Sequence, residues 1–224
     1  YNGILIFHGT GAGKTCTAIT IAEQFIENIK KNPIPEQRKC LFIYPGTSIE
    51  ENFKDGLYSF TKEKDELQYK LVHGTRQCTG DKYYIPKSNF DSNEERIKAI
   101  EKGYKENYEF MGKQELTNKI KEIINNANET YKTHINAQTQ IETEISNYFS
   151  NRVIIIDEIH NFKKIDKMDD TNENIEDFKP IDALHKIIKI SNNIKLILMS
   201  ATPMFDKSIE IIRSEEHTSE LQSP

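Results

Sequence analysis

The chain has 224 residues, of which 36% are hydrophobic and 29% charged, and this is enough for one sizeable hydrophobic core. We therefore expect one α/β domain. The formal net charge of −5 gives no indication of a nucleic-acid partner, although a basic cleft on an acidic body would not show in this sum. No apolar run approaches the ~20 residues needed to cross a bilayer, so we expect a soluble protein with no membrane partner.

Both ends of the chain are unusual. It starts at Tyr1, directly on the first predicted strand, and we expect that upstream sequence is missing. Residues 213–224 resemble the in-frame translation of a sequencing adapter, which predicts a non-native tail without function; an ordinary polar tail is the alternative. The predicted domain therefore covers residues 1–212.

The first motif is a glycine-rich loop that follows the apolar run Gly3–Phe7 and precedes a helical pattern. Such a loop turns successive backbone N–H groups toward an anion, and this predicts a phosphate-binding loop. Lys14 would reach the β- and γ-phosphates, and the Thr15 hydroxyl would bind Mg²⁺. His8 stands where the widest form of the motif has a glycine, so the match is to the Gly-Lys-Thr end. A glycine-rich turn with an incidental lysine is the alternative. The predicted binding residues are Gly9, Thr10, Gly11, Ala12, Gly13, Lys14 and Thr15.

The three cysteines, Cys16, Cys40 and Cys78, have no Cys-x-x-Cys spacing and no paired histidines nearby. We interpret them as reduced thiols of an intracellular protein.

Helical spacing of apolar residues predicts a helix over residues 14–30, and the apolar run Cys40–Tyr44 predicts a parallel strand covered on both faces. The residues that follow this strand support two interpretations. Their hydroxyl and N–H groups could contact a ligand phosphate, or a hydroxyl could simply cap the next helix. These residues are Pro45, Gly46, Thr47 and Ser48.

A third strand is predicted at residues 69–73, and the polar stretch to residue 107 is expected to be a loop or insertion with a short helix at residues 94–102. A fourth strand is predicted at residues 108–111. Two helices should follow, with apolar residues over 116–124 and 135–149, and we interpret the narrow apolar stripe of the second as packing and not as a binding groove.

The plainest buried strand is Arg152–Ile156, and it ends in Asp157, Glu158 and, two residues on, His160. In a doubly wound sheet, ligands bind at the carboxyl ends of the strands, so these acidic residues should reach the same rim as Lys14. Asp157 would hold Mg²⁺, and Glu158 would deprotonate the water that attacks the γ-phosphate. A surface turn is the alternative.

Residues 163–176 mix lysines with carboxylates and predict a solvated loop without a metal site. A helix at residues 182–190 and a core strand at 194–199 follow. Ser200, Ala201 and Thr202 come directly after this strand; alone they would be an ordinary turn.

Three motifs in this order, each at a strand end, resemble motifs I, II and III of superfamily 2 helicases. They are the Thr-Gly-Ala-Gly-Lys-Thr loop ending at Thr15, the Asp-Glu-Ile-His box ending at His160, and Ser-Ala-Thr ending at Thr202. The resemblance covers residues 3–212 and implies an α/β RecA-like P-loop NTPase domain, with a doubly wound, mostly parallel sheet, helices on both faces and a helical insertion. More narrowly, the box through Asn161 and the Ser-Ala-Thr-Pro-Met run are similar to DExH, SNF2-like helicases of nucleocytoplasmic large DNA viruses.

The resemblance also implies roles for matched residues. ATP and Mg²⁺ would be bound by the loop and Asp157, Glu158 would be the catalytic base, and His160, Ser200, Ala201 and Thr202 would couple hydrolysis to nucleic-acid contact. Residues 45–48 fall where the family's motif Ia contacts the DNA or RNA backbone. If the protein is viral, we expect it in the host cytoplasm or the virion, with the viral transcription machinery as a partner.

The second RecA-like domain of this family, with its arginine fingers, is absent from the 224 residues. Because an arginine finger is worth about 10³ to 10⁵ in rate in related sites, we expect the chain alone to bind ATP and turn it over poorly. A nucleotide-gated structural subunit of a transcription complex is the alternative function. A P-loop kinase or switch protein is disfavoured by Ser-Ala-Thr after the strand that follows Glu158.

Overall fold

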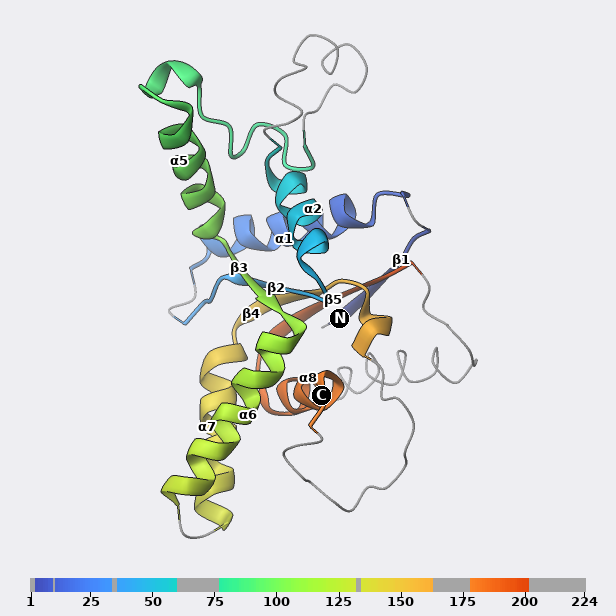
Figure 1. Ribbon diagram of the computed structural model, residues 1–224, viewed down its shortest axis with the longest axis vertical. Coiled ribbons are helices and arrows are strands. Elements are labelled where there is room, and N and C mark those ends of the chain that lie inside the picture. The colour runs from blue at the N-terminus through green and yellow to red at the C-terminus, as the bar shows by residue number, and fades with distance from the viewer. Residues whose placement is uncertain are drawn as a thin grey trace.

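The computed structural model describes residues 3–9, 11–33, 36–59, 77–131, 134–162 and 178–201. Within these residues, five strands form one sheet that lies between two layers of helices (Figure 1). The strands are β1 (Gly3–Phe7), β2 (Cys40–Tyr44), β3 (Tyr108–Gly112), β4 (Arg152–Ile156) and β5 (Ile194–Ser200).

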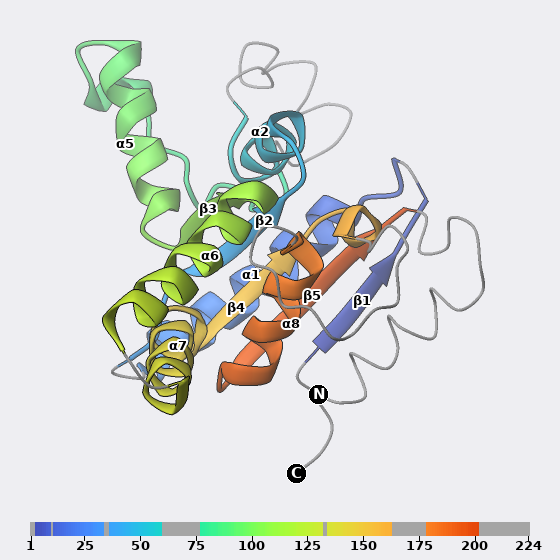
Figure 2. The ribbon, with the colours of Figure 1, turned by 60° about the horizontal axis from the view of Figure 1, so that its bottom comes forward.

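The strand order is β1-β5-β4-β2-β3, and all the pairings are parallel. The first and last strands of the described chain therefore lie side by side, blue against red in Figure 2. Parallel strands must be covered on both faces, because their crossover connections place helices there. The predicted α/β fold with a parallel sheet is confirmed.

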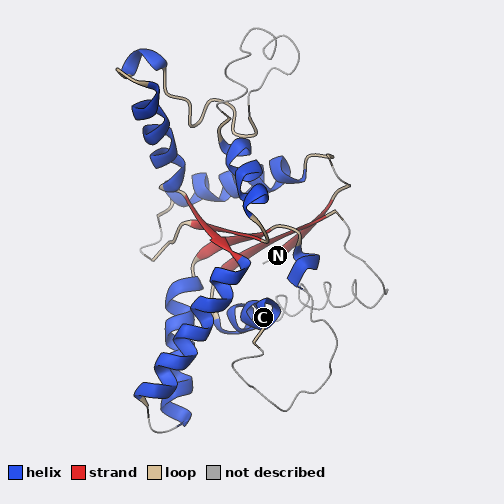
Figure 3. Cartoon of the chain, in the orientation of Figure 1, coloured by secondary structure: helices blue, strands red, loops and turns tan. Residues whose placement is uncertain are grey.

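One face of the sheet is covered by α1 (Lys14–Lys31), α2 (Thr47–Leu57) and α5 (Asn93–Lys105) (Figure 3). The 3₁₀ turn η1 (Lys87–Asn89) comes directly before α5. Buried apolar residues of these helices pack on alternate residues of the strands. The strand residues in this cluster are Ile6, Cys40, Phe42, Tyr108, Val153, Ile155, Ile197 and Met199.

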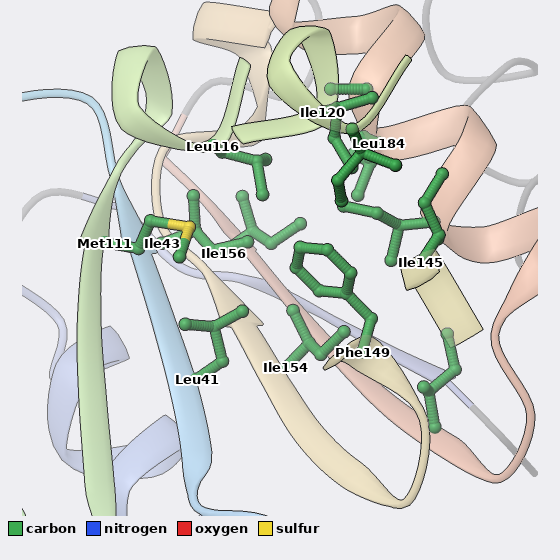
Figure 4. Packing of buried hydrophobic residues seen from close by; sticks show 14 of the residues in the cluster. Leu41, Ile43, Met111, Leu116, Ile120, Ile145, Phe149, Ile154, Ile156 and Leu184 are labelled. Carbon is green, nitrogen blue, oxygen red and sulfur yellow. The ribbon is translucent and has the colours of Figure 1, made fainter. Parts of the chain in front are cut away.

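The other face is covered by α6 (Lys113–Thr130), α7 (His134–Phe149) and α8 (Pro180–Ile190), and the 3₁₀ turn η2 (Ile159–Phe162) contributes Phe162 to its core. Figure 4 shows this core, with the Phe149 ring among strand and helix residues. Leu41, Ile43, Ile154 and Ile156 come from the strand positions that the first face skips. Two helices connect β3 to β4, which agrees with the predicted helical insertion.

The predicted strands Cys40–Tyr44 and Arg152–Ile156 have the observed bounds. The helices are longer than predicted: α5 begins at Asn93, where the Ser92 Oγ accepts a hydrogen bond from the Glu95 N–H at 3.2 Å. The strand predicted at residues 69–73, the loop predicted at 163–176 and the tail at 213–224 lie outside the described residues.

The interpretation of the cysteines as reduced thiols is wrong for one pair. Cys16 of α1 and Cys78 form a disulfide, whereas Cys40 is a buried free thiol. No described helix is long and apolar enough to span a membrane.

A buried carboxylate fastens α1 to the sheet edge. The Glu23 side chain accepts hydrogen bonds of 2.8 Å from both the Tyr83 and the Tyr108 hydroxyls, and it also pairs with Lys82. Burial, and the negative charge of Glu23, raise the pKa of Tyr83 and of Tyr108, so both hydroxyls stay protonated as donors. This network holds the segment before α5 and the first residue of β3 on α1.

The substitution Tyr108→Phe removes one of these donors from a carboxylate that is 7% exposed. We expect it to lower the free energy of unfolding by about 1–2 kcal/mol, because Glu23 would be left undersatisfied in the core. Urea denaturation measures the effect. Tyr131→Phe, at an exposed tyrosine after α6, is the matched control and should change stability by less than about 0.5 kcal/mol. Equal stability of the two variants would contradict the role given to Glu23.

Candidate nucleotide-binding site

The sheet register brings the three sequence motifs to one rim. Phe7 pairs with Ser200, and Ile156 pairs with Leu198, so β1, β5 and β4 end at nearly the same level. The glycine-rich loop, Asp157 and Ala201 each follow one of these ends. Residues from the beginning and the end of the described chain are therefore brought together at the carboxyl edge of the sheet, where open α/β sheets bind ligands.

The loop between β1 and α1 adopts a conformation that requires glycine. Gly11 has a φ of +77° and Gly13 a φ of +84°, both in the left-handed region. A Cβ added to either residue would meet nothing within 4 Å, so the requirement comes from the backbone conformation and not from lack of space. The Ala12 N–H donates to the Gly9 carbonyl at 3.1 Å, and Gly13 is the N-cap of α1. Thr10 lies outside the described residues.

Lys14, the first residue of α1, points at Glu158. Its Nζ lies 3.0 Å from Glu158 Oε1, and the two side chains are only 11% and 21% exposed. An ion pair shielded in this way holds both side chains at the rim, between motif I and motif II. Thr15 follows Lys14 and is partly buried.

Asp157 and Glu158 are adjacent, yet they are held differently. The Asp157 N–H continues the strand by donating to the Ile43 carbonyl of β2 at 3.1 Å. At Glu158 the backbone turns, with a φ of +48°, and its N–H donates to Asp157 Oδ1 at 2.8 Å. This reversal lets Glu158 reach Lys14 while Asp157 stays close to the sheet, with 7% of its surface exposed.

Burial raises the pKa of Asp157 above its usual range, and the hydrogen bond from the Glu158 N–H opposes this in part. The neighbouring Glu158 charge raises the pKa further, and Lys14 lowers it. A carboxylate kept in such a place favours a cation as partner. Asp157 and the Thr15 hydroxyl are oxygen donors of the kind that Mg²⁺ takes, and Mg²⁺ typically uses one or two protein ligands and keeps several waters. The donor set fits that ion.

His160 and Ser200 extend the polar contacts toward the third motif. The His160 Nδ1 lies 3.2 Å from Glu158 Oε2 and 3.1 Å from Ser200 Oγ. Ser200 is fully buried at the end of β5, and Ala201 beyond it is partly exposed. Lys14, Glu158, His160 and Ser200 thus form one continuous series of polar contacts across the three motifs. Thr202 lies outside the described residues.

The fourth group of predicted residues lies at the end of β2. Pro45 and Gly46 are partly buried, and Thr47 and Ser48 are exposed in the first turn of α2. The N-cap of α2 is Gly46, in an extended conformation, so the interpretation of Thr47 or Ser48 as a helix cap is wrong. Both residues lie near the rim that carries the other motifs.

The candidate site is an open rim. Gly11, Ala12 and Gly13 are exposed. Two hollows lie elsewhere: one of about 330 Å³ is lined mainly by residues of α6 and α7, and one of about 560 Å³ mainly by residues of α7 and α8. Two features of the site were not predicted from the sequence. The Ile43 carbonyl accepts the Asp157 N–H, and the disulfide of Cys78 ends on α1 at Cys16, next to Thr15. Neither has a local sequence pattern that would have indicated it.

Known proteins similar to this chain come from large DNA viruses. "Putative ATP-dependent RNA helicase R563" of Acanthamoeba polyphaga mimivirus is 31% identical over 94% of the chain, and "Putative ATP-dependent RNA helicase L377" of the same virus is 28% identical over 95%. "Putative helicase 087L" of Invertebrate iridescent virus 3 is 24% identical over 95%. The chain covers 28%, 17% and 18% of these proteins, respectively, so it corresponds to a part of each.

A family model described as "Type III restriction enzyme, res subunit" matches residues 1–205, which is nearly the whole chain. This match and the viral relatives confirm the resemblance to superfamily 2 helicases that the three motifs indicate. The chain belongs to the type III restriction enzyme res subunit family of helicase domains.

Proposed function

We propose that the chain is the ATP-binding and hydrolysing domain of a motor that acts on nucleic acid. The observation that carries this proposal is the series of contacts from Lys14 through Glu158 and His160 to Ser200, because it connects the phosphate-binding loop to the residues assigned to coupling. If the loop were a glycine-rich turn with an incidental lysine, Lys14 would not need to pair with Glu158, which lies 144 residues further along the chain, just after β4.

In the proposed reaction, Lys14 exchanges partners. In the structure its charge is neutralised by Glu158 at 3.0 Å. A triphosphate in the loop would attract the ammonium group through charge-assisted hydrogen bonds, which are stronger than neutral ones. Departure of Lys14 frees the Glu158 carboxylate to accept a proton from the attacking water. Binding of the phosphates by Lys14 would therefore also free Glu158 to act as the base.

Asp157 and Thr15 would hold Mg²⁺ beside a bound triphosphate. When bound there, the ion neutralises charge that develops on the phosphate oxygens. Asp157 is prepared for this role because its N–H is fixed by the Ile43 carbonyl and its Oδ1 by the Glu158 N–H. His160 and Ser200 would relay the state of Glu158 to the nucleic-acid side of the rim.

We propose that nucleic acid contacts residues 45–48, where Thr47 and Ser48 are exposed. The domain would work within a longer protein, with a second RecA-like domain that closes over the γ-phosphate and supplies the arginine. The names of the two mimivirus relatives contain "RNA helicase", which supports RNA as the polymer. Association with a viral transcription machinery stays a prediction from the family resemblance.

Two substitutions separate binding from chemistry. Lys14→Ala should weaken ATP binding by about tenfold or more, because a charged hydrogen bond to phosphate is lost. Glu158→Gln should retain or strengthen binding, because Lys14 loses a competing charge, and it should abolish hydrolysis. Nucleotide titration of the chain and phosphate release by the longer protein measure the two effects. Lys30→Ala, at an exposed lysine in the last turn of α1, is the control. Unchanged turnover in Glu158→Gln would refute the base assignment.

Asp157→Asn tests the Mg²⁺ assignment through a trade-off between stability and binding. The raised pKa of Asp157 means that folding disfavours its ionised form, so a neutral amide should raise the Tm of the free protein. The same change should remove most of the additional Tm shift that Mg²⁺ and ATP give the wild type. Thermal melts with and without Mg²⁺ and ATP measure both effects, and Asp91→Asn is the exposed control. A full Mg²⁺-dependent shift in Asp157→Asn would count against the assignment.

Thr47→Glu tests the nucleic-acid contact. A carboxylate in the first turn of α2 favours the helix dipole, so the fold should be retained, but it would repel a phosphate backbone. We expect binding of single-stranded RNA at low salt to weaken about threefold or more, with ATP binding unchanged. Fluorescence anisotropy with a labelled oligonucleotide measures the effect. Thr139→Glu, at an exposed threonine of α7, should have no effect on RNA binding, and equal loss in both variants would contradict the assigned surface.

A further inference from the structure

The Cys16–Cys78 disulfide joins the first turn of α1 to the segment that leads toward α5. The two Cα atoms lie 5.0 Å apart, within the ordinary range for a disulfide, and the cysteines are 62 residues apart in the chain. Cys16 follows Lys14 and Thr15, the residues proposed to bind phosphate and Mg²⁺. A covalent link therefore ends within the helix turn that carries the nucleotide site.

On its Cys78 side, the disulfide packs against residues of α1 and α2. A Cβ built on Gly56 of α2 would be 2.6 Å from Ile19 Cδ1, 3.4 Å from Cys78 Sγ and 3.5 Å from Thr15 Cγ2. The Cys78 N–H donates to the Gly56 carbonyl at 2.9 Å, and the Thr79 hydroxyl donates to the Leu57 carbonyl at 2.7 Å. Cys78 and Thr15 thus both lie beside Gly56, where α1 meets the end of α2.

The two kinds of cysteine in the chain differ in access. Cys16 is exposed and Cys78 is partly exposed, so a reductant can reach the bond. Cys40 is 2% exposed, and burial raises its pKa far above the usual range of a thiol, which makes it inert. Exposed disulfides are the labile ones, and they are often regulatory.

We propose that Cys16–Cys78 is a redox site whose reduction weakens nucleotide binding at the neighbouring loop. This inference rests on the proposed ATP-binding function. The reductant is a dithiol. One of its thiolates attacks Cys16 Sγ, the sulfur–sulfur bond breaks, and Cys78 leaves as a thiolate that takes up a proton. The second thiol of the reductant then displaces Cys16. Two electrons and two protons pass to the cysteines, and the reductant becomes a disulfide.

Reduction acts on the loop through packing. The two sulfur atoms are no longer bonded and must separate to van der Waals contact, yet Gly56 already lies against Cys78, and Thr15, next to Cys16 in the chain, also lies beside Gly56. The first turn of α1 and the residue 77–84 segment would therefore move apart, and nucleotide would have to restore the order that the covalent link maintains. By linkage, bound nucleotide must oppose reduction by the same factor by which reduction weakens binding.

The experiment compares the oxidised and reduced chain. Thiol titration in guanidinium should find one free thiol after treatment with oxidised glutathione and three after dithiothreitol. Titration with a fluorescent ATP analogue and Mg²⁺ should give an affinity at least about fivefold weaker in the reduced protein. The analogue should shift the thiol–disulfide equilibrium with glutathione by the same factor, which a merely structural disulfide would not show. The double variant Cys16→Ser, Cys78→Ser is the control and should bind equally under both conditions.

Each result decides between the hypotheses. Three free thiols after the oxidising treatment, or equal affinity in both redox states, would overturn the redox site and leave the proposed function standing. No analogue binding in either state would overturn the proposed function and, with it, the coupling. In that case a Tm about 10 °C lower on reduction would still show that the link forms, because a disulfide that closes a loop of this length restricts the unfolded chain.

Discussion

The parallel register of β1, β5 and β4 is the constraint on which the candidate site depends. The neighbouring strands β4 and β5 are buried on both faces, so a slip of one residue would move their apolar side chains from one helix layer to the other. The register is therefore strongly specified by packing, and with it the level at which the strands end. Lys14, Asp157 and Ser200 owe their proximity to this packing and not to any interaction among themselves.

The backbone turn at Glu158 depends on local contacts of the site and not on the packing of the sheet. A φ of +48° at a residue other than glycine costs about 1 kcal/mol or more, and it persists only where the surroundings favour it. Here the Asp157 carboxylate accepts the Glu158 N–H, the Glu158 carbonyl accepts the Asn161 N–H at 2.8 Å, and Lys14 attracts the side chain. Local polar contacts thus turn the chain away from the strand immediately after β4.

Local sequence predicted those features that local physics determines. Continuous apolar runs specified β2 and β4 to the residue, because a strand buried on both faces has few polar positions. Apolar spacing over residues 116–124 placed α6 but underestimated its length, because such spacing marks only the buried face. The disulfide between Cys16 and Cys78, and the Gly56 contact beside it, depend on how two helices and a distant segment meet. No pattern within a short window carries that information.

The ion pair of Lys14 and Glu158 connects the fold to the proposed mechanism. Each partner compensates the other's charge in a partly shielded place, so removal of one leaves the other poorly compensated. A ligand that replaces Glu158 as the partner of Lys14 must supply negative charge at the loop, as a triphosphate does. Glu158 then needs another partner. His160, whose Nδ1 is 3.2 Å from the second Glu158 oxygen, is in position to be that partner. His160 also contacts Ser200 at the end of β5. A change in the partner of Lys14 would therefore alter the polar contacts of the third motif without movement of the sheet.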